Sequence, residues 1–239
     1  MIVSRWRRST VTTAIEPATT PVWEGIYEPA EAARYLRATE NADAIYPMRS
    51  TKLVRWIRRG FAAPELAQVA GRELLIDFDD LISMRVIAAL RAAGASWNEI
   101  RGTERWLREA TGVRHPFATE TLWAGRGQVF AEWESRLVSG SRHGQIALDI
   151  VREFLLPIHG LTFGGESRKA ISWEPYAGVI LKPSVQFGAP CVQGTRIPTR
   201  SLAGMVAAGD SMEWVAGAYG VSPKAVQAAC DWEFRLQSQ

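Results

Sequence analysis

Hydrophobic residues recur at helical spacing over most of the chain, and short apolar stretches around glycine pairs interrupt this pattern in its middle third. Helices are predicted over residues 27–36, 50–59, 81–93, 97–110, 145–155, 211–219 and from 223 onwards, with a further helical pattern from Ser201. Short strands are predicted over 66–78, over 117–123 with 128–130, and over 161–163 with 170–173. The pattern therefore predicts a mainly α fold with small β elements, of the α+β class.

Polar residues and glycines at the predicted helix ends support these boundaries. N-caps are predicted at Ser50, Asp79, Ser96, Ser211 and Ser222. The expected organisation is a flexible arm over residues 1–20, a helical domain with a wing over 21–112, a β-containing middle segment over 113–177, and a C-terminal helical bundle over 178–239.

The helix predicted over residues 50–59 has one apolar stripe and one basic face. Leu53 and Ile57 face one way, and residues 49–59 contain five basic residues and no acidic one. Such a helix fits the major groove of DNA, although a solvated charged face is an equally open interpretation. The residues predicted to contact DNA are Ser50, Thr51, Lys52, Arg55, Arg58, Arg59 and, at the tip of the wing, Arg72.

Residues 188–199 form a stiff connector that precedes the last helices. Its two glycines allow positive φ, and its two prolines fix φ. Arg196 is the one charged residue in this stretch. The predicted structural turn consists of Gly188, Pro190, Gly194, Thr195, Arg196 and Pro198. We expect Arg196 to hold this turn through Glu213 or through backbone carbonyls; the alternative is that it projects outward and contacts a partner.

Residues 211–219, the turn at Gly220 and the capped helix from Ser222 follow the order of a helix-turn-helix unit. The longer segment from Gly178 to residue 239, which includes this unit, carries Leu181-Lys182-Pro183, Gly188-x-Pro190 and Gly194-Thr195-Arg196-Ile197-Pro198. In these motifs it resembles a bacterial family of small domains of formerly uncharacterised function, associated with antitoxins of the VapB type. The resemblance implies a VapBC antitoxin that restrains a PIN-domain ribonuclease encoded next to it and binds operator DNA as an autorepressor.

The chain differs from the common VapB plan, in which a small DNA-binding domain precedes a disordered toxin-binding tail, because few residues follow its last helix. Residues 25–112 resemble the winged helix of MerR-type regulators. The stretch that carries this resemblance runs Ala88-Ala89-Leu90-Arg91-x-x-Gly94-x-Ser96-x-x-Glu99-Ile100. Neither a long coiled coil nor a cysteine cluster follows it, so effector sensing is not expected.

The composition excludes some classes of protein but does not indicate a function. The 239 residues include 28 basic and 25 acidic side chains, two cysteines and ten tryptophans. No apolar run is long enough for a membrane span, so no membrane contact is expected. Two cysteines without metal spacing indicate reduced thiols in a cytoplasmic protein, and neither a metal nor a cofactor is expected. Because one helix-turn-helix covers too little DNA for tight specific binding, we expect a homodimer. Asp77, Asp79 and Asp80 are close acids but match a strand end and a helix cap better than a catalytic site. A free-standing transcriptional regulator without a toxin is the alternative function.

Overall fold

The computed structural model describes residues 25–39, 48–61, 74–92, 94–120, 160–164 and 168–238. Its helices are α1 (Pro29–Ala38), α2 (Ser50–Arg58), α3 (Phe78–Ala92), α4 (Trp97–Thr111), α8 (Thr199–Ala207), α9 (Met212–Tyr219) and α10 (Pro223–Gln237), with 3-10 turns η2 (Pro116–Ala118) and η4 (Gln186–Gly188). Its strands are β1 (Leu161–Gly164), β2 (Lys169–Tyr176), β3 (Val179–Leu181) and β4 (Cys191–Val192). The predicted α+β class is confirmed.

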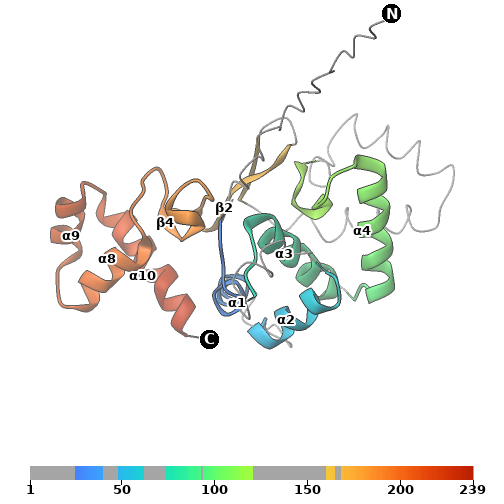
Figure 1. Cartoon of the computed structure of the whole chain (residues 1–239). Helices are drawn as coiled ribbons and strands as arrows, with labels where there is room; N and C mark the ends of the chain where they lie inside the picture. Colours follow the sequence, from blue (N-terminus) through green and yellow to red (C-terminus); the bar gives the residue numbers. More distant parts are fainter. Residues whose placement is uncertain are drawn as a thin grey trace, which may run out of the picture.

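The four strands form one antiparallel sheet in the order β1-β2-β3-β4. Leu161 pairs with Trp173, as the predicted hairpin over 161–173 requires. The strands lie between two groups of helices, α1–α4 on one side and α8–α10 on the other (Figure 1). Because the sheet runs from residue 161 to 192, it crosses the predicted domain boundary at 177/178.

A continuous core joins the two helical groups. The Tyr27 and Tyr35 rings meet edge to face at 6.1 Å, and the Tyr35 ring lies 6.2 Å from that of Trp232 on α10. The Tyr27 hydroxyl donates a buried hydrogen bond to the Gly188 carbonyl at 3.1 Å. A second, smaller core holds α8, α9 and α10 together; its buried residues are Val192, Leu202, Val215, Ala216, Val226 and Ala229.

The predicted serine N-caps at the starts of three helices are confirmed. The Ser96, Ser211 and Ser222 side chains accept hydrogen bonds from backbone N–H groups at the start of α4, α9 and α10. Ser50 is not a cap: it is the first residue of α2, and Arg49 precedes the helix without a side-chain bond. Arg49 has the extended backbone of an N-cap residue, which shifts the helix start by one position.

The predicted cap at Asp79 is also wrong. Helix α3 begins at Phe78, and the Asp77 carboxylate accepts the Asp80 N–H at 2.7 Å. The Asp79 carboxylate instead lies 2.9 Å from the Lys169 ammonium at the start of β2. The ion pair with Lys169 thus orients the Asp79 side chain, and Asp77 supplies the hydrogen bond at the start of the helix.

The strand predicted over 117–123 begins instead as the turn η2, because Pro116 fixes a helical φ at its start. Of the strands predicted over 66–78, Ile76 forms an isolated antiparallel bridge with Tyr27, whereas Phe78 belongs to α3. The arm over 1–20, the wing tip with Arg72, residues 128–130 and the helix over 145–155 lie outside the described residues. In the sequence, residues 39–49 separate α1 from α2, which is more than the turn of about 3–4 residues in a compact helix-turn-helix.

Candidate nucleic-acid interface

Helix α2 is amphipathic in the structure. Leu53, Trp56 and Ile57 are buried at 0%, 3% and 6% exposure and pack this helix onto the core. The opposite face presents exposed side chains, namely Thr51, Arg55, Arg58 and Arg59. Since these four positions lie at helical spacing, the arginines share one direction away from the core.

The remaining predicted DNA contacts lie at the edge of this face. Ser50 is half-buried at the helix start, and Lys52 is half-buried with its ammonium 5.3 Å from the centre of the Trp56 ring. Arg55 and Arg58 also lie in the last turn, where cations interact favourably with the negative end of the helix dipole. Between residues 49 and 61 the chain contains no acidic side chain, so the face carries a net positive charge.

Two further arginines, neither of them predicted to contact DNA, extend the basic surface toward α4. The Arg101 guanidinium stacks 4.8 Å from the Phe61 ring and donates to the Arg59 carbonyl at 2.8 Å. The Arg91 guanidinium lies 4.8 Å from the Trp97 ring. Arg101 follows Trp97 by one helical turn, a spacing that could have indicated a shared face.

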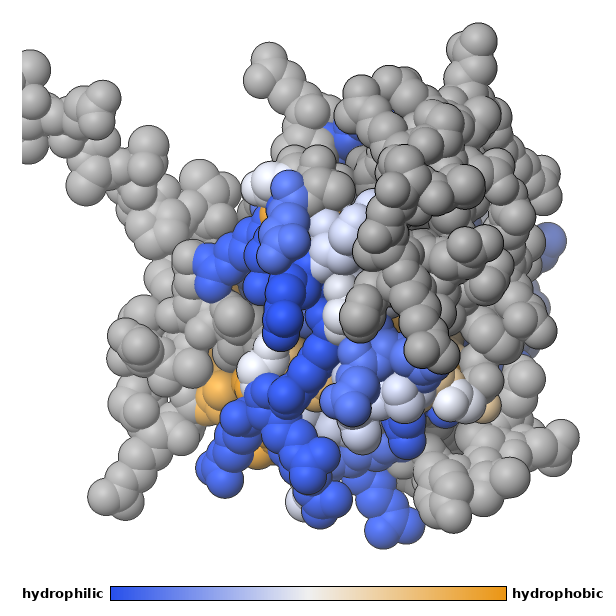
Figure 2. Space-filling model, turned by 90° about the vertical axis from the view of Figure 1, so that its right-hand side faces the viewer, coloured by the Kyte–Doolittle hydropathy of each residue, from blue (hydrophilic) through white to orange (hydrophobic). Residues whose placement is uncertain are grey.

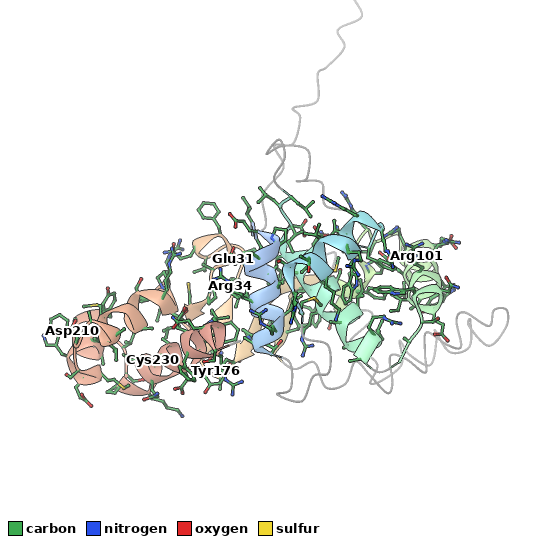
Figure 3. All side chains as sticks on the ribbon, turned by 90° about the horizontal axis from the view of Figure 1, so that it is seen from below. Glu31, Arg34, Arg101, Tyr176, Asp210 and Cys230 are labelled. Atoms are coloured by element: carbon green, nitrogen blue, oxygen red, sulfur yellow. The ribbon has the colours of Figure 1, made fainter. Side chains whose placement is uncertain are left out.

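The aromatic rings beneath these cations form a compact cluster. The Trp97 ring lies 5.2 Å from that of Trp56 and 4.6 Å from that of Phe61. We name the combined surface of Arg55, Arg58, Arg59, Arg91 and Arg101 over these rings the basic face. The side of the molecule where α4 lies presents mostly hydrophilic side chains (Figure 2), and Arg101 lies at the opposite end of the molecule from Asp210 (Figure 3).

A capping box fixes the start of α4 beside this cluster. The Ser96 hydroxyl accepts the Glu99 N–H at 3.3 Å, and the Glu99 carboxylate accepts the Ser96 N–H at 2.6 Å. These hydrogen bonds from Ser96 lower the pKa of Glu99, so the carboxylate stays charged at the helix N-terminus. The box thereby holds Trp97, the first helical residue, against α2 and Phe61.

The helix pair α9–α10, the second predicted helix-turn-helix, lacks a comparable basic surface. From α8 to the end of α10, the cations are Arg200, Lys224 and Arg235, against the acids Asp210, Glu213, Asp231 and Glu233. Arg235 also stacks 4.9 Å from the Tyr176 ring. This end of the molecule is therefore slightly acidic, unlike α2.

A buried ionisable cluster lies where α3, η2 and β2 meet. The His115 Nδ1 lies 3.6 Å from an Asp80 carboxylate oxygen, next to the ion pair of Asp79 with Lys169. Burial raises the pKa of Asp80 to about 8 and lowers that of His115 to about 4. Among the described residues, no three His, Cys, Asp or Glu side chains are placed to hold a metal ion.

The predicted structural turn has a different anchor from the one expected. The Thr195 hydroxyl donates to the Val192 carbonyl at 2.9 Å and accepts the Ile197 N–H at 3.1 Å. The Arg196 side chain is exposed and forms no hydrogen bond or ion pair with a described residue, so the expected contact with Glu213 is absent there. Thr195 supplies the side-chain hydrogen bonds that we expected from Arg196.

The glycines and prolines of the turn fit its backbone. Gly188 and Gly194 have φ of +88° and +77°, which favour glycine. The Pro190 carbonyl accepts the Thr199 N–H at 3.0 Å, and Pro198 forms an isolated bridge with Cys191. These bonds tie the turn to the start of α8.

None of the helices in the described ranges has the length and apolar character that a membrane crossing requires.

The C-terminal residues and the whole chain both match known proteins. Residues 179–232 match a family described as protein of unknown function, DUF433. Over 225 residues the chain is 26% identical to a Mycobacterium tuberculosis protein named "Putative antitoxin VapB45", covering 86% of this chain and 92% of the relative. The fold matches the crystal structure of Rv2018 from M. tuberculosis with a TM-score of 0.61 and 23% identity, covering 86% of this chain and 96% of that one.

The structural match shows that the two chains share a fold, and the functional indication comes from the antitoxin-named relative. The DUF433 match runs from β3 into α10 and includes the structural turn, while the match to the antitoxin-named relative covers 86% of the chain. Together they support a VapB-like antitoxin.

Proposed function

We propose that this protein neutralises a PIN-domain ribonuclease toxin encoded beside it and represses their operon by binding operator DNA through the basic face. The antitoxin part of this proposal is supported by the relative named as a VapB antitoxin, which covers 86% of the chain. The DNA part is supported chiefly by one observation, the exposed arginine row of α2 over a buried apolar stripe.

The chemistry of the basic face suits duplex DNA. Contacts with phosphates supply most of the affinity of DNA for a protein that presents several exposed cations. An α-helix such as α2 fits into the major groove. Arginine can contact a phosphate or guanine edge with two parallel hydrogen bonds. In this arrangement Arg55, Arg58 and Arg59 face the DNA, while Arg101 braces the end of α2 through the Arg59 carbonyl.

The alternative DNA reader, α9–α10, is disfavoured by its charge. Duplex DNA repels acidic groups, and Asp210 and Glu213 precede or begin α9. We therefore assign DNA binding to α2 and leave the C-terminal helices to another partner.

The first experiment measures the salt dependence of DNA binding. The probe is a labelled duplex that covers the region upstream of the operon, titrated by fluorescence anisotropy at several salt concentrations. Replacing Arg55, Arg58 and Arg59 by Ala should weaken binding. The slope of log K against log salt should also fall by about 0.9 for every phosphate that the variant no longer neutralises.

The control variant removes three exposed cations elsewhere, Arg196, Arg200 and Lys224, and so changes the net charge equally. It should retain the wild-type slope, because its cations lie outside the basic face. Equal slopes for the two variants would refute the assignment to α2.

The second experiment tests the toxin partner. The chain is co-expressed with the neighbouring gene product, purified through a tag on that product, and assayed for suppression of its ribonuclease activity. Co-purification with loss of ribonuclease activity is expected. A neighbour that neither binds nor is restrained would instead favour a free-standing DNA-binding regulator.

We also propose that the protein binds DNA as a homodimer, because one short recognition helix covers too little DNA for tight specific binding. Light scattering at micromolar concentration and moderate salt should give twice the chain mass of 26.5 kDa. A monomeric mass both free and on DNA would contradict this.

A further inference from the structure

The turn η4 holds an aromatic side chain in an unusual backbone conformation. Gln186 and Phe187 both have positive φ, +50° and +54°, although neither is glycine. The left-handed region is unfavourable for residues with a Cβ, and bulky residues are found there when the surroundings impose it. The Phe187 ring is nevertheless 71% exposed, so its burial does not compensate for the strain.

Hydrogen bonds from Ile26 and Tyr27 hold this conformation. The Ile26 N–H donates to the Phe187 carbonyl at 3.3 Å, and the Tyr27 hydroxyl donates to the carbonyl of Gly188. Gly188 leaves no room for a side chain, since a Cβ there would lie 2.1 Å from the Tyr27 hydroxyl oxygen. The fold thus holds the strained turn rigidly and directs a phenyl ring into solvent.

Two exposed arginines lie on the segment that η4 contacts. The Gln186 side-chain amide donates to the Arg196 carbonyl at 3.2 Å, which ties η4 to the turn over residues 194–197. Arg196 and Arg200 are exposed, and both act electrostatically on the Cys191 thiol, so their charges lie near the same strand. We name Phe187, Arg196 and Arg200 the aromatic–arginine patch.

We propose that the aromatic–arginine patch is the surface that binds the toxin, whose matching surface has an apolar pocket for the Phe187 ring and carboxylates for the two arginines. This inference rests on the proposed antitoxin function and adds the location of its protein interface. Aromatic and arginine side chains dominate the binding energy of protein interfaces, and a preformed conformation reduces the ordering cost.

Charge distinguishes this partner from the other candidates. A two-fold contact with a second copy would place the patch against itself and oppose arginine with arginine. Duplex DNA offers phosphates for the arginines but no apolar pocket for an isolated phenyl ring outside the base stack. A protein surface with acidic side chains around a pocket satisfies both components.

The test uses the full chain with the toxin from the neighbouring gene, measured by calorimetric titration. Glycine adopts positive φ readily, so Phe187→Gly should leave the melting temperature of the free protein unchanged or raise it. The same variant should weaken toxin binding at least tenfold. A merely structural role for Phe187 would not separate stability from binding in this way.

The control is Trp214→Ala, which removes an aromatic ring that is 57% exposed on α9. It should bind the toxin as the wild type does. A second variant, Arg196→Ala with Arg200→Ala, should bind at least tenfold more weakly at low salt, with a normal melt and normal affinity for operator DNA.

Each other outcome overturns the inference. Unchanged toxin affinity in Phe187→Gly, or an equally weakened affinity in Trp214→Ala, would place the interface elsewhere while the antitoxin function stands. A change in the mass of the free protein would assign the patch to a second copy, and reduced DNA affinity would assign it to the operator. A wild-type chain that fails to bind the toxin would reject the proposed function together with this inference.

Discussion

Replacing Gly188 by Ala tests the junction between the two ends of the chain. The added methyl group meets two obstacles. The backbone has φ of +88°, and the Cβ position lies 2.1 Å from the hydroxyl oxygen and 2.8 Å from the Cζ of Tyr27. The Tyr27 ring is 1% exposed and cannot move aside without disturbing the core.

The magnitude follows from the backbone conformation and the hydrogen bond. The left-handed conformation costs an L-residue about 1–2 kcal/mol. Displacing the Tyr27 hydroxyl also breaks its buried hydrogen bond to the Gly188 carbonyl, which adds about 1–3 kcal/mol when a polar group is left unsatisfied. We therefore expect Gly188→Ala to lower the free energy of unfolding by roughly 2–5 kcal/mol.

Gly194→Ala provides a matched control, because Gly194 has φ of +77° but no atom within 4 Å of its Cβ position. It should show the cost of the backbone conformation alone. Both variants can be compared by urea unfolding followed through tryptophan fluorescence, with equal m-values as the check on two-state behaviour. If Gly188→Ala is no more destabilising than Gly194→Ala, the contact with Tyr27 does not contribute and the reasoning is refuted.

Two further predictions concern side chains of the turn and the buried cluster. Thr195→Val removes both hydrogen bonds of the hydroxyl and should lower the free energy of unfolding by about 1–2 kcal/mol in thermal melts. Arg196→Ala should leave that free energy within about 0.5 kcal/mol of the wild-type value. If Arg196→Ala is the more destabilising change, Arg196 and not Thr195 anchors the turn. Burial raises the folded-state pKa of Asp80 from 3.8 to about 8. The contribution of the protonated Asp80 carboxyl to the free energy of unfolding is therefore fully present below about pH 4 and is lost as pH rises toward 8. The lowered pKa of His115, about 4 against 6.5, has the opposite effect on stability below pH 6.5. Asp80→Asn should therefore remove the decline between about pH 6.5 and 8, and parallel pH profiles of unfolding free energy would contradict this.

Short-range contacts were the predictable part of the fold. A serine cap at Ser96, Ser211 or Ser222 involves residues three positions apart. The spacing of apolar residues on one face of a helix is likewise visible within a single short stretch of sequence. The basic row of α2 was visible for the same reason. The α+β class followed from adding such local signals along the chain.

Contacts between distant residues explain the errors. Asp79 resembles a cap locally, but Lys169 holds its carboxylate. Arg196 is the lone charge in a stiff turn and so indicated a buried partner, yet the neutral hydroxyl of Thr195 forms the side-chain bonds. The Tyr27–Gly188 bond joins residues 161 positions apart, and no local pattern indicates it. Arg101 was missed because its partners Phe61 and Arg59 lie on another segment.

The packing of Tyr35 against Trp232 determines how this chain can be dissected. A fragment that carries only residues 179–232 would lack the neighbours of a tryptophan that is 0% exposed in the whole protein, and a fragment that stops before it would expose Tyr35. Truncation would therefore produce pieces with open apolar faces rather than separate functional modules. Point substitutions are the safer way to separate two activities in this chain. Because α1 and α10 pack against each other through these two rings, we expect a ligand that stabilises either end to slow proteolysis at both.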